Sequence, residues 1–355
     1  IEDFDVKKRD RYSLNKQVVD EFVLENQHIA SWKDLSKALI LFKRENRMEI
    51  SKLDLIASYR SLKLDNPEFY SVITKKSMRS QSGVLVCTVF TSGHPEYDSV
   101  NKTTGKVTRI KQKFSCKHDC YYCPLEKAHP GNNWVEQPRS YLTKEPGVLR
   151  ANRANYDCLT QMHMRLDQYN AMGHIIDKLE VLVLGGTFSE YPAPYQETFV
   201  RDIYFAANTY SENSENSENS ENSEENTRPR GSLSDEITLN TRSRVRIIGL
   251  TLETRPDVIT LSEIVRFRQF GCTRVQLGIQ HTDDVVLKKS NRGHGVSDSI
   301  RAIGLLKANG YKIDGHLMPN LLDTTPEKDR TMLRRILADP DLQMDQLKIY
   351  PVSVV

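Results

Sequence analysis

The feature that most constrains the fold is a regular alternation of short apolar segments with amphipathic ones beyond residue 80. The short segments are rich in Val, Ile and Leu, as buried strands are, and the stretches between them have the apolar spacing of helices. Alternating strands and helices favour a parallel sheet or barrel. Six strands predict an α/β fold, a partial (β/α)6 barrel of the TIM type. The predicted strands are GVLVCTVFT, LEVLVLGG, RVRIIGLTLET, RVQLGIQ, KIDGHLMP and DQLKIYPVSVV.

Residues 1–80 have a different pattern and are predicted to form a helical N-terminal extension, whereas residues 81–355 form the barrel domain. VVDEFVLENQ and WKDLSKALILFKREN carry apolar residues at helical spacing. Within the barrel, the polar repeat SENSENSENSENSEEN cannot bury apolar surface and predicts a disordered insert over 209–234. VLRANRANYDCLTQMHMRLDQYNAMG predicts one long helix, and NKTTGKVTRIKQKF a basic loop.

Composition excludes some classes of protein. No apolar run approaches the ~20 residues that a membrane span needs, and the first residues, IEDFDVKKRD, are no signal peptide. The net charge of +3 does not by itself mark a nucleic-acid-binding protein. Three of the six cysteines lie within eight residues, which indicates ligation and not a disulfide framework. We therefore expect a reducing compartment, the cytoplasm, with the nucleus as a second location.

The clustered cysteines are Cys116, Cys120 and Cys123 in SCKHDCYYCPLE, and the next cysteine is Cys158. A structural zinc site needs four ligands, so zinc would require His118 or His129 as well. Three cysteines suit a [4Fe–4S] cluster with one open iron, which can chelate the amine and carboxylate of S-adenosylmethionine. C-x3-C-x-aromatic-C is the signature of radical-SAM enzymes, with Tyr122 at the aromatic position. The sequence therefore predicts a cluster loop after the first strand of the barrel.

Several strand ends are predicted to contact S-adenosylmethionine. Gly185 and Gly186 expose backbone to a ligand, and Thr187 follows them where related enzymes have an acid. Glu253 and Arg255 end the next strand and could bind ribose and carboxylate, or form a salt bridge with each other. The loop NRGHG could meet phosphate or be a plain turn. Further predicted cofactor contacts at strand ends are Gln276, Gln280, His316 and Met318.

Basic residues gather in three segments near the predicted cluster loop. Charge runs usually form a solvated face, but three positive segments beside one cofactor site would suit a polyanion such as RNA. The predicted RNA-binding residues are Lys75, Lys76, Arg79, Lys111, Lys113, Lys144, Arg150 and Arg153.

A string of motifs resembles the catalytic subunit of Elongator, a radical-SAM family that modifies the wobble uridine of tRNA. The resemblance covers about residues 70–355, and the earlier helices are similar to the tRNA-binding N-terminal region of the family. The Cys-Pro-Gly-Gly stretch of the family is Cys-Pro-Leu-Glu here. The motifs are MRSQSGV, QPRSYLTKEPGVLRANRANYD, VLVLGGTF, LTLETRPD, GCTRVQLGIQ, NRGHG, HLMPNL and LKIYP, in the order of the family.

The resemblance implies a reaction that attaches a carboxymethyl group, derived from acetyl-CoA, to C5 of the wobble uridine. It implies Lys144 and Glu253 as catalytic residues, and the tRNA anticodon loop, other Elongator-type subunits or a second copy as partners, with no membrane involved. The family's acetyltransferase domain would follow LKIYP, so we expect the acetyl-CoA site to lie outside this chain and expect the chain alone to form little carboxymethyluridine.

Two other classes of function stay open from the sequence. One is a radical-SAM enzyme with another substrate, such as a tetrapyrrole or a methylthiolation substrate, which assay of tRNA nucleosides would distinguish. The other is a non-catalytic tRNA-binding module that uses a structural metal, which cleavage of S-adenosylmethionine would exclude.

Overall fold

The computed structural model describes residues 16–100, 103–114, 116–210 and 228–352, so the Ser-Glu-Asn repeat lies outside the described residues. The chain divides into two compact units, residues 1–85 with 164–177 and residues 86–163 with 178–355. Within the described ranges, no helix is long and apolar enough to cross a membrane.

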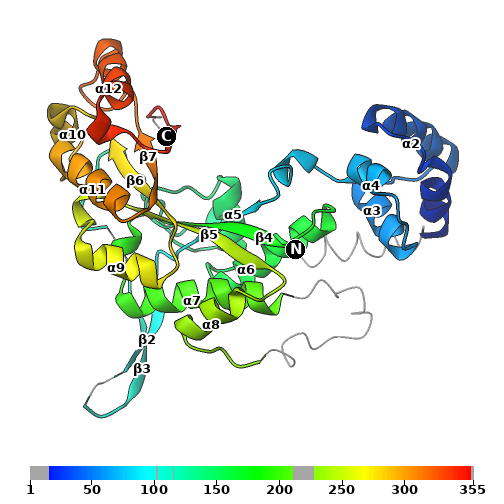
Figure 1. Ribbon diagram of the computed structural model, residues 1–355, viewed down its shortest axis with the longest axis horizontal. Helices are drawn as coiled ribbons and strands as arrows, with labels where there is room; N and C mark the ends of the chain where they lie inside the picture. The colour runs from blue at the N-terminus through cyan, green and yellow to red at the C-terminus, as the bar shows by residue number, and fades with distance from the viewer. Residues whose placement is uncertain (1–15, 101–102, 115, 211–227, 353–355) are drawn as a thin grey trace. The chain divides into compact units, whose positions relative to one another are not determined.

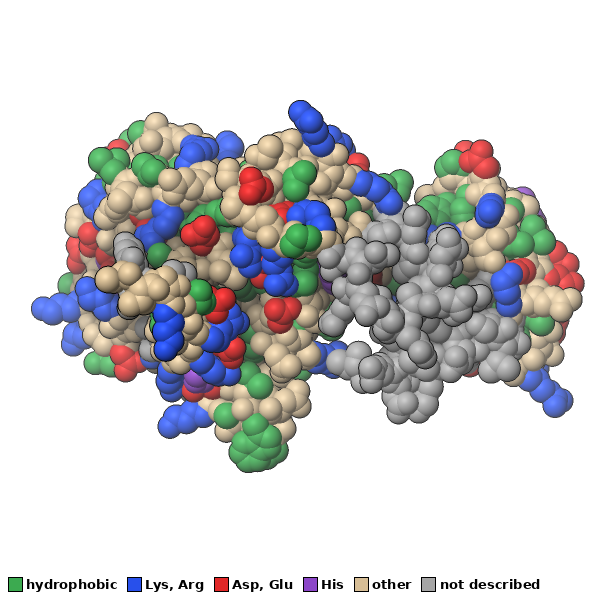
Figure 2. All heavy atoms as spheres, turned by 90° about the horizontal axis from the view of Figure 1, so that it is seen from below, with side chains coloured by type: hydrophobic (Ala, Val, Ile, Leu, Met, Phe, Trp, Pro, Cys, Tyr) green, Lys and Arg blue, Asp and Glu red, His purple; other side chains and the backbone are tan. Residues whose placement is uncertain are grey.

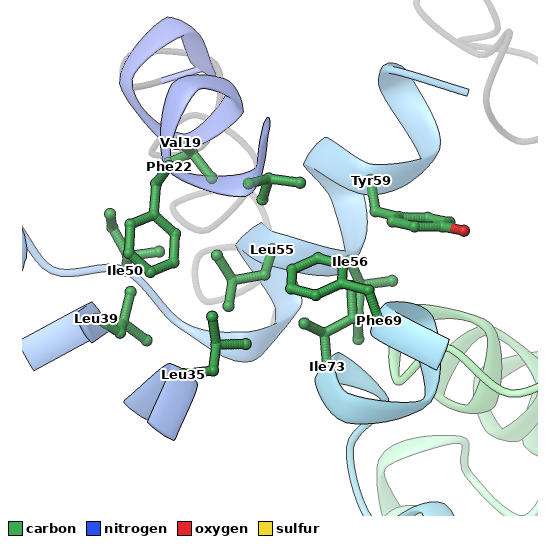
Figure 3. Packing of buried hydrophobic residues seen from close by; sticks show 11 residues of the cluster. Val19, Phe22, Leu35, Leu39, Ile50, Leu55, Ile56, Tyr59, Phe69 and Ile73 are labelled. Carbon is green, nitrogen blue, oxygen red and sulfur yellow. The ribbon is translucent and has the colours of Figure 1, made fainter. Parts of the chain in front are cut away.

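The first unit is a small helical bundle, as the apolar spacing predicts. Residues 16–26 are helical, and Ser51 and Asp54 form a capping box at the start of the third helix, which satisfies backbone N–H groups there. The further helices are α2 (Trp32–Asn46), α3 (Lys52–Ser61), α4 (Pro67–Ile73) and the 3-10 turn η1 (Ser77–Arg79). Figure 3 shows the apolar core that they enclose, which comprises Val19, Phe22, Val23, Leu35, Leu39, Ile50, Leu55, Ile56, Tyr59, Phe69 and Ile73.

The second unit contains a six-stranded sheet in the order β1-β4-β5-β6-β7-β8, which curls into a half-barrel (Figure 1). This confirms the predicted partial barrel. The pairs from β4 to β8 are parallel, so the carboxyl ends of these strands meet at one edge. The strands are β1 (Leu85–Phe90), β4 (Lys178–Leu184), β5 (Arg246–Thr254), β6 (Arg274–Gln280), β7 (Lys312–Leu317) and β8 (Gln346–Ile349).

Helices and short turns connect the strands. β6 is buried along nearly its whole length, as expected for a central strand of a parallel sheet covered by helices. The helices are α5 (Pro146–Arg153), α6 (Cys158–Ala171), α7 (Ala193–Thr209), α8 (Leu233–Asn240), α9 (Leu261–Gln269), α10 (Asp284–Lys289), α11 (Val296–Ala308) and α12 (Pro326–Ala338). The 3-10 turns are η2 (Pro130–Asn132), η3 (Phe188–Glu190), η5 (Pro256–Val258) and η6 (Pro340–Leu342).

The single long helix predicted from Val148 onward is wrong, because the chain forms α5 and α6 with a break between them. Asn155 and Tyr156 adopt left-handed backbone conformations with φ of 48° and 58°. The side chain of Asp157 then accepts a hydrogen bond from the backbone N–H of Thr160 at 2.8 Å, which starts the second helix.

The basic loop predicted over residues 101–114 is also wrong in part, because β2 (Glu96–Val100) and β3 (Val107–Lys111) form an antiparallel hairpin. This two-stranded ribbon projects away from the sheet (Figure 1). The predicted insert, 209–234, is too long at its second end. Arg228 forms an ion pair with buried Glu236 at 2.6 Å, and α8 begins at Leu233.

Candidate active site at the cysteine loop

The three clustered cysteines lie on a loop that packs against the carboxyl end of β4. Cys120 is buried, whereas Cys116 and Cys123 are half-buried. Sγ of Cys116 lies 3.4 Å from Oγ1 of Thr187, the residue that follows the glycine pair after β4. The backbone N–H of Lys117 donates to Glu190 at 2.7 Å. The cysteine loop is therefore at the edge of the half-barrel where active sites of such folds lie.

Guanidinium groups surround the cysteine sulfurs. Nη1 of Arg292 and Nη1 of Arg255 lie 3.6 and 3.8 Å from Sγ of Cys120. Although burial lowers the pKa of Arg139, hydrogen bonds to Asp119 and Cys123 raise it above its usual value. An iron–sulfur cluster held by thiolates carries negative charge, and hydrogen bonds to its sulfurs tune its potential. The donors around these cysteines therefore fit such a cluster.

Cys123 has a second polar neighbour, since Oγ of Ser140 lies 2.8 Å from its sulfur. Burial raises the pKa of the Cys116 thiol, which therefore stays protonated until a metal displaces its proton. We infer that Cys116, Cys120 and Cys123 are the residues of this loop that would hold the cluster.

The two histidines considered for a zinc site pair with carboxylates. Nε2 of His118 lies 3.4 Å from Asp257, and Nε2 of His129 lies 2.8 Å from Glu126. Within the described part of the chain, no three His, Cys, Asp or Glu side chains converge as they would around a single metal ion. The contacts of both imidazoles are thus explained without a metal.

The loop Ser290–Gly295, which contains NRGHG, packs directly on the cysteine loop. The side chain of Asn291 donates to the carbonyl of Asp119 at 2.7 Å, and the N–H of Tyr121 donates to the carbonyl of Ser290 at 3.2 Å. Gly293, with φ of 75°, lies so close to His118 that a Cβ there would overlap the imidazole. From the sequence this loop was expected to meet phosphate or to form a plain turn; its contacts with the cysteine loop were not predicted, because no local pattern indicates them.

The glycine pair after β4 has backbone conformations that other residues rarely adopt, with φ of 129° at Gly185 and 103° at Gly186. Gly185 packs against buried Thr91, and its carbonyl accepts a hydrogen bond from the hydroxyl of Tyr191 at 3.1 Å. These contacts orient the backbone of Gly185–Thr187 toward the cysteine loop. Binding of S-adenosylmethionine by this segment stays a prediction.

Glu253, at the end of β5, lies inside the half-barrel among polar groups from other strands. The hydroxyl of Tyr141 donates to its carboxylate at 2.7 Å, and Nδ1 of His316 lies 3.9 Å away. Burial raises the pKa of Glu253 and lowers the pKa of His316 to about 3, so the imidazole is neutral. Burial also lowers the pKa of Lys348 on β8. Tyr141 and Lys348 were not predicted from the sequence as neighbours of Glu253.

This environment predicts a pH-dependent stability for the cofactor-free protein. The pKa of the Glu253 carboxyl is higher in the folded protein than in the unfolded chain, where it is about 4.5. The free energy of unfolding therefore falls as pH rises from about 4.5 through the pKa of the folded protein. Glu253→Gln keeps an acceptor for Tyr141 without the charge, so it should melt at a higher temperature than wild type at about pH 8. The gain should shrink as pH falls toward about 4.5, as measured by circular dichroism. Exposed Glu327→Gln is the control with little change, and an equal or lower melting temperature for Glu253→Gln at the higher pH would contradict the prediction.

Arg255 is almost wholly buried, with 2% of its surface exposed, and its ion pair is with Asp257 at 2.9 Å and not with Glu253. Its Nη2 donates to the carbonyl of Arg292 at 2.6 Å. The second contact ties the end of β5 to the loop Ser290–Gly295, which packs on the cysteine loop. The predicted contact of Arg255 with the cofactor stays a prediction.

The remaining predicted cofactor contacts lie on or just after β6 and β7, with Gln276 near the start of β6, Gln280 at its end, His316 within β7 and Met318 directly after β7. The side-chain amide of Gln276 faces Asp314 at 3.4 Å, and Gln280, with φ of 72°, accepts a backbone hydrogen bond from Met318 at 2.8 Å. Within the described residues, several buried polar atoms near these strands and the cysteine loop lack hydrogen-bond partners. They include Oε1 of Gln276, Oε1 of Gln280, Nε2 of His316 and the hydroxyl of Tyr122. Polar atoms of this kind are available to a bound ligand.

The predicted RNA-binding residues are mostly exposed, but some already have acidic partners. Lys111 pairs with Glu96 and Lys113 with Glu136, each at 2.6 Å. Lys and Arg side chains are interspersed with Asp and Glu on the face shown in Figure 2. Lys75, Lys76, Lys144 and Arg153 are exposed, and Arg79 and Arg150 are half-buried. Binding of RNA, and a catalytic role for Lys144, stay predictions.

Comparisons with known proteins agree with the geometry. The model of the radical SAM superfamily matches residues 165–336. The tRNA uridine(34) acetyltransferase of Dehalococcoides mccartyi is 38% identical over 259 residues, covering 72% of this chain and 51% of that protein. Elongator complex protein 3 of Saccharomyces cerevisiae is 32% identical over 280 residues, covering 79% of this chain and 44% of that protein.

A solved structure is similar as well. The archaeal Methanocaldococcus infernus Elp3 with an N-terminal deletion matches with a TM-score of 0.53 at 28% identity, covering 76% of this chain and 46% of that chain. This chain spans about half the length of the curated relatives it matches.

Proposed function

Because the chain belongs to the radical SAM superfamily, in the family of tRNA uridine(34) acetyltransferases and Elongator complex protein 3, we propose that it modifies the wobble uridine of tRNA. The modification is carboxymethylation at C5 with acetyl-CoA as co-substrate. The observation that carries the proposal is the loop of Cys116, Cys120 and Cys123, with guanidinium donors at its sulfurs, beside the carboxyl ends of the strands.

The cysteines would hold a [4Fe–4S] cluster, which with S-adenosylmethionine supplies radical chemistry when bound. The protein itself positions and shields the reactants. The backbone of Gly185–Thr187 offers polar groups beside Cys116, where a methionine amino group would be oriented. Glu253, held by Tyr141, can accept hydrogen bonds from ribose hydroxyls. The interior of the half-barrel, where burial shifts the pKa values of Glu253 and His316, would shield the reacting atoms from water.

The substrate nucleotide must leave the stack of the anticodon loop to reach this interior. Unpaired loop bases can be splayed outward, so a wobble base is accessible where a base within a duplex is not. The exposed basic residues would contact phosphates and position the loop.

The test is anaerobic reconstitution with iron and sulfide, followed by reduction in the presence of S-adenosylmethionine. We expect 5′-deoxyadenosine from the loaded chain, and modified wobble uridine when tRNA, acetyl-CoA and an acetyltransferase domain are added. A loaded chain that forms no 5′-deoxyadenosine would instead support a tRNA-binding module with a structural cluster. Cleavage without any change to tRNA nucleosides would support another substrate.

The proposal also predicts how charge affects tRNA affinity. Reversing Lys75, Lys76 and Arg79 to Glu should weaken binding and lower the slope of log affinity against log salt by about one unit per lost phosphate contact. Fluorescence anisotropy with labelled tRNA over a range of salt concentrations measures this slope. The matched control reverses three exposed lysines on α10 and α11, Lys288, Lys289 and Lys307, and should change the slope little. Equal slopes for both triple variants would count against this surface.

A further inference from the structure

Arg292 is a buried cation in the loop Ser290–Gly295, which packs on the cysteine loop. Only 7% of its surface is exposed, its Nη2 donates to the carbonyl of Gly278 on β6, and its Nη1 lies 3.6 Å from Sγ of Cys120. Its Nε is buried and has no hydrogen-bond partner within the described residues. The guanidinium is therefore held in place by a carbonyl and a sulfur.

The neighbouring guanidinium groups are neutralised by carboxylates, and Arg292 is not. Arg255 pairs with Asp257, and Arg139 pairs with Asp119. Among the ion pairs of the described residues, none joins Arg292 to an Asp or a Glu. Asp257 instead faces Arg255, His118 and His294.

A buried cation without a counter-charge is costly, because low-dielectric surroundings do not replace its hydration. The negative charge that balances Arg292 must therefore come from the side where Sγ of Cys120 lies. A cysteine that binds a metal does so as a thiolate, so Cys120 becomes part of an anion when the cluster is bound. Among the described residues no carboxylate pairs with Arg292, and a bound cluster would supply the missing negative charge beside it.

We propose that Arg292 is the internal counter-ion of the [4Fe–4S] cluster on Cys116, Cys120 and Cys123, and that its charge makes this cluster easier to reduce. The inference rests on the proposed cluster but not on the proposed tRNA substrate. One electron from a low-potential donor adds one negative charge to the cluster. A fixed positive charge beside Cys120 stabilises this reduced state more than the oxidised state, so Arg292 raises the reduction potential.

The experiment compares reconstituted wild type, Arg292→Met and Arg292→Lys by dithionite titration followed by electron paramagnetic resonance, without tRNA or S-adenosylmethionine. At a fixed solution potential, Arg292→Met should lower the ratio of reduced to oxidised cluster about tenfold, equivalent to about 59 mV for one electron. Arg292→Lys keeps the charge and should restore most of the ratio. Arg330→Met, which removes an exposed guanidinium on α12, should leave it unchanged.

A second measurement separates the counter-ion from a purely structural residue. Without metal, Arg292→Met removes an unbalanced buried charge, so its melting temperature should equal or exceed that of wild type. A lower melting temperature without metal would overturn the proposal. Loss of iron from Arg292→Met with retention by Arg292→Lys would support it, since the charge is then needed to hold the cluster.

Three further results would overturn the proposal. One is an unchanged cluster potential in Arg292→Met with normal iron content. Another is an unchanged potential with weaker binding of S-adenosylmethionine, which would assign Arg292 to the carboxylate of that cofactor. The third is loss of iron from both variants with native melting temperatures. The shape of the guanidinium, and not its charge, would then be what holds the loop Ser290–Gly295 against the cysteine loop. None of these results depends on tRNA modification, so failure of the proposed substrate is seen separately.

Discussion

Replacing Cys120 with Ser should lower the iron content of reconstituted protein from about four atoms per chain to about none. The proposed cluster is bound to the protein through these three cysteines, and the guanidinium groups of Arg255 and Arg292 lie beside Sγ of Cys120. A serine hydroxyl is a poor substitute for a thiolate ligand, so cleavage of S-adenosylmethionine should fall to the background rate. Iron analysis and chromatographic assay of 5′-deoxyadenosine measure the two effects, and Cys116→Ser and Cys123→Ser should behave alike.

The matched control for this prediction is Cys158→Ser. Cys158 is also a buried cysteine, at the start of α6, and burial raises its pKa well above the usual value. Its thiol donates to the carbonyl of Phe199 at 3.4 Å, a bond that a serine hydroxyl can also make. Iron content and cleavage should therefore be retained. Full iron content in Cys120→Ser, or tightly bound zinc in anaerobically purified wild type, would contradict the cluster assignment.

Replacing Gly185 with Ala should destabilise the protein by about 2–4 kcal/mol, through backbone strain and overpacking. Its φ of 129° belongs to a region that residues with a Cβ avoid. The added Cβ would also overlap Oγ1 of Thr91, which is 1% exposed and whose N–H donates to the carbonyl of Leu184 at 2.9 Å. Urea unfolding measures the change in free energy. Relief of the overlap would move the end of β4 away from the cysteine loop, so iron uptake should fall as well.

Gly304→Ala is the control for the chemical change itself. Gly304 lies in α11, is exposed, and has no neighbour within 4 Å of the position that a Cβ would occupy. Alanine at an exposed position within a helix should stabilise the protein by roughly 1 kcal/mol. Equal stabilities for Gly185→Ala and Gly304→Ala would mean that the backbone after β4 tolerates a side chain, and that its conformation is not specific to glycine.

The elements of the fold were predictable because their signals are local. Runs such as LEVLVLGG and RVQLGIQ carry the apolar residues of buried strands, and the segments between them carry helical spacing. The spacing of Cys116, Cys120 and Cys123 is equally local, so the sequence alone determined the partial barrel and its cysteine loop. The local pattern gave a wrong prediction at the break between α5 and α6. The spacing of α5 and α6 looks continuous, yet left-handed Asn155 and Tyr156 separate them.

Only the tertiary structure decided which polar groups meet around the cysteines. Arg292 reaches Cys120 across 172 residues of chain, and Tyr141 reaches Glu253 across 112. Such pairs carry no periodicity, because each partner is positioned by the end of a different strand or by a different loop. Glu253 and Arg255 were predicted at one strand end, but their side chains have different partners, Tyr141 and Asp257. The sequence thus determined which residues stand at the edge of the half-barrel, and the curl of the sheet decided which of them come into contact.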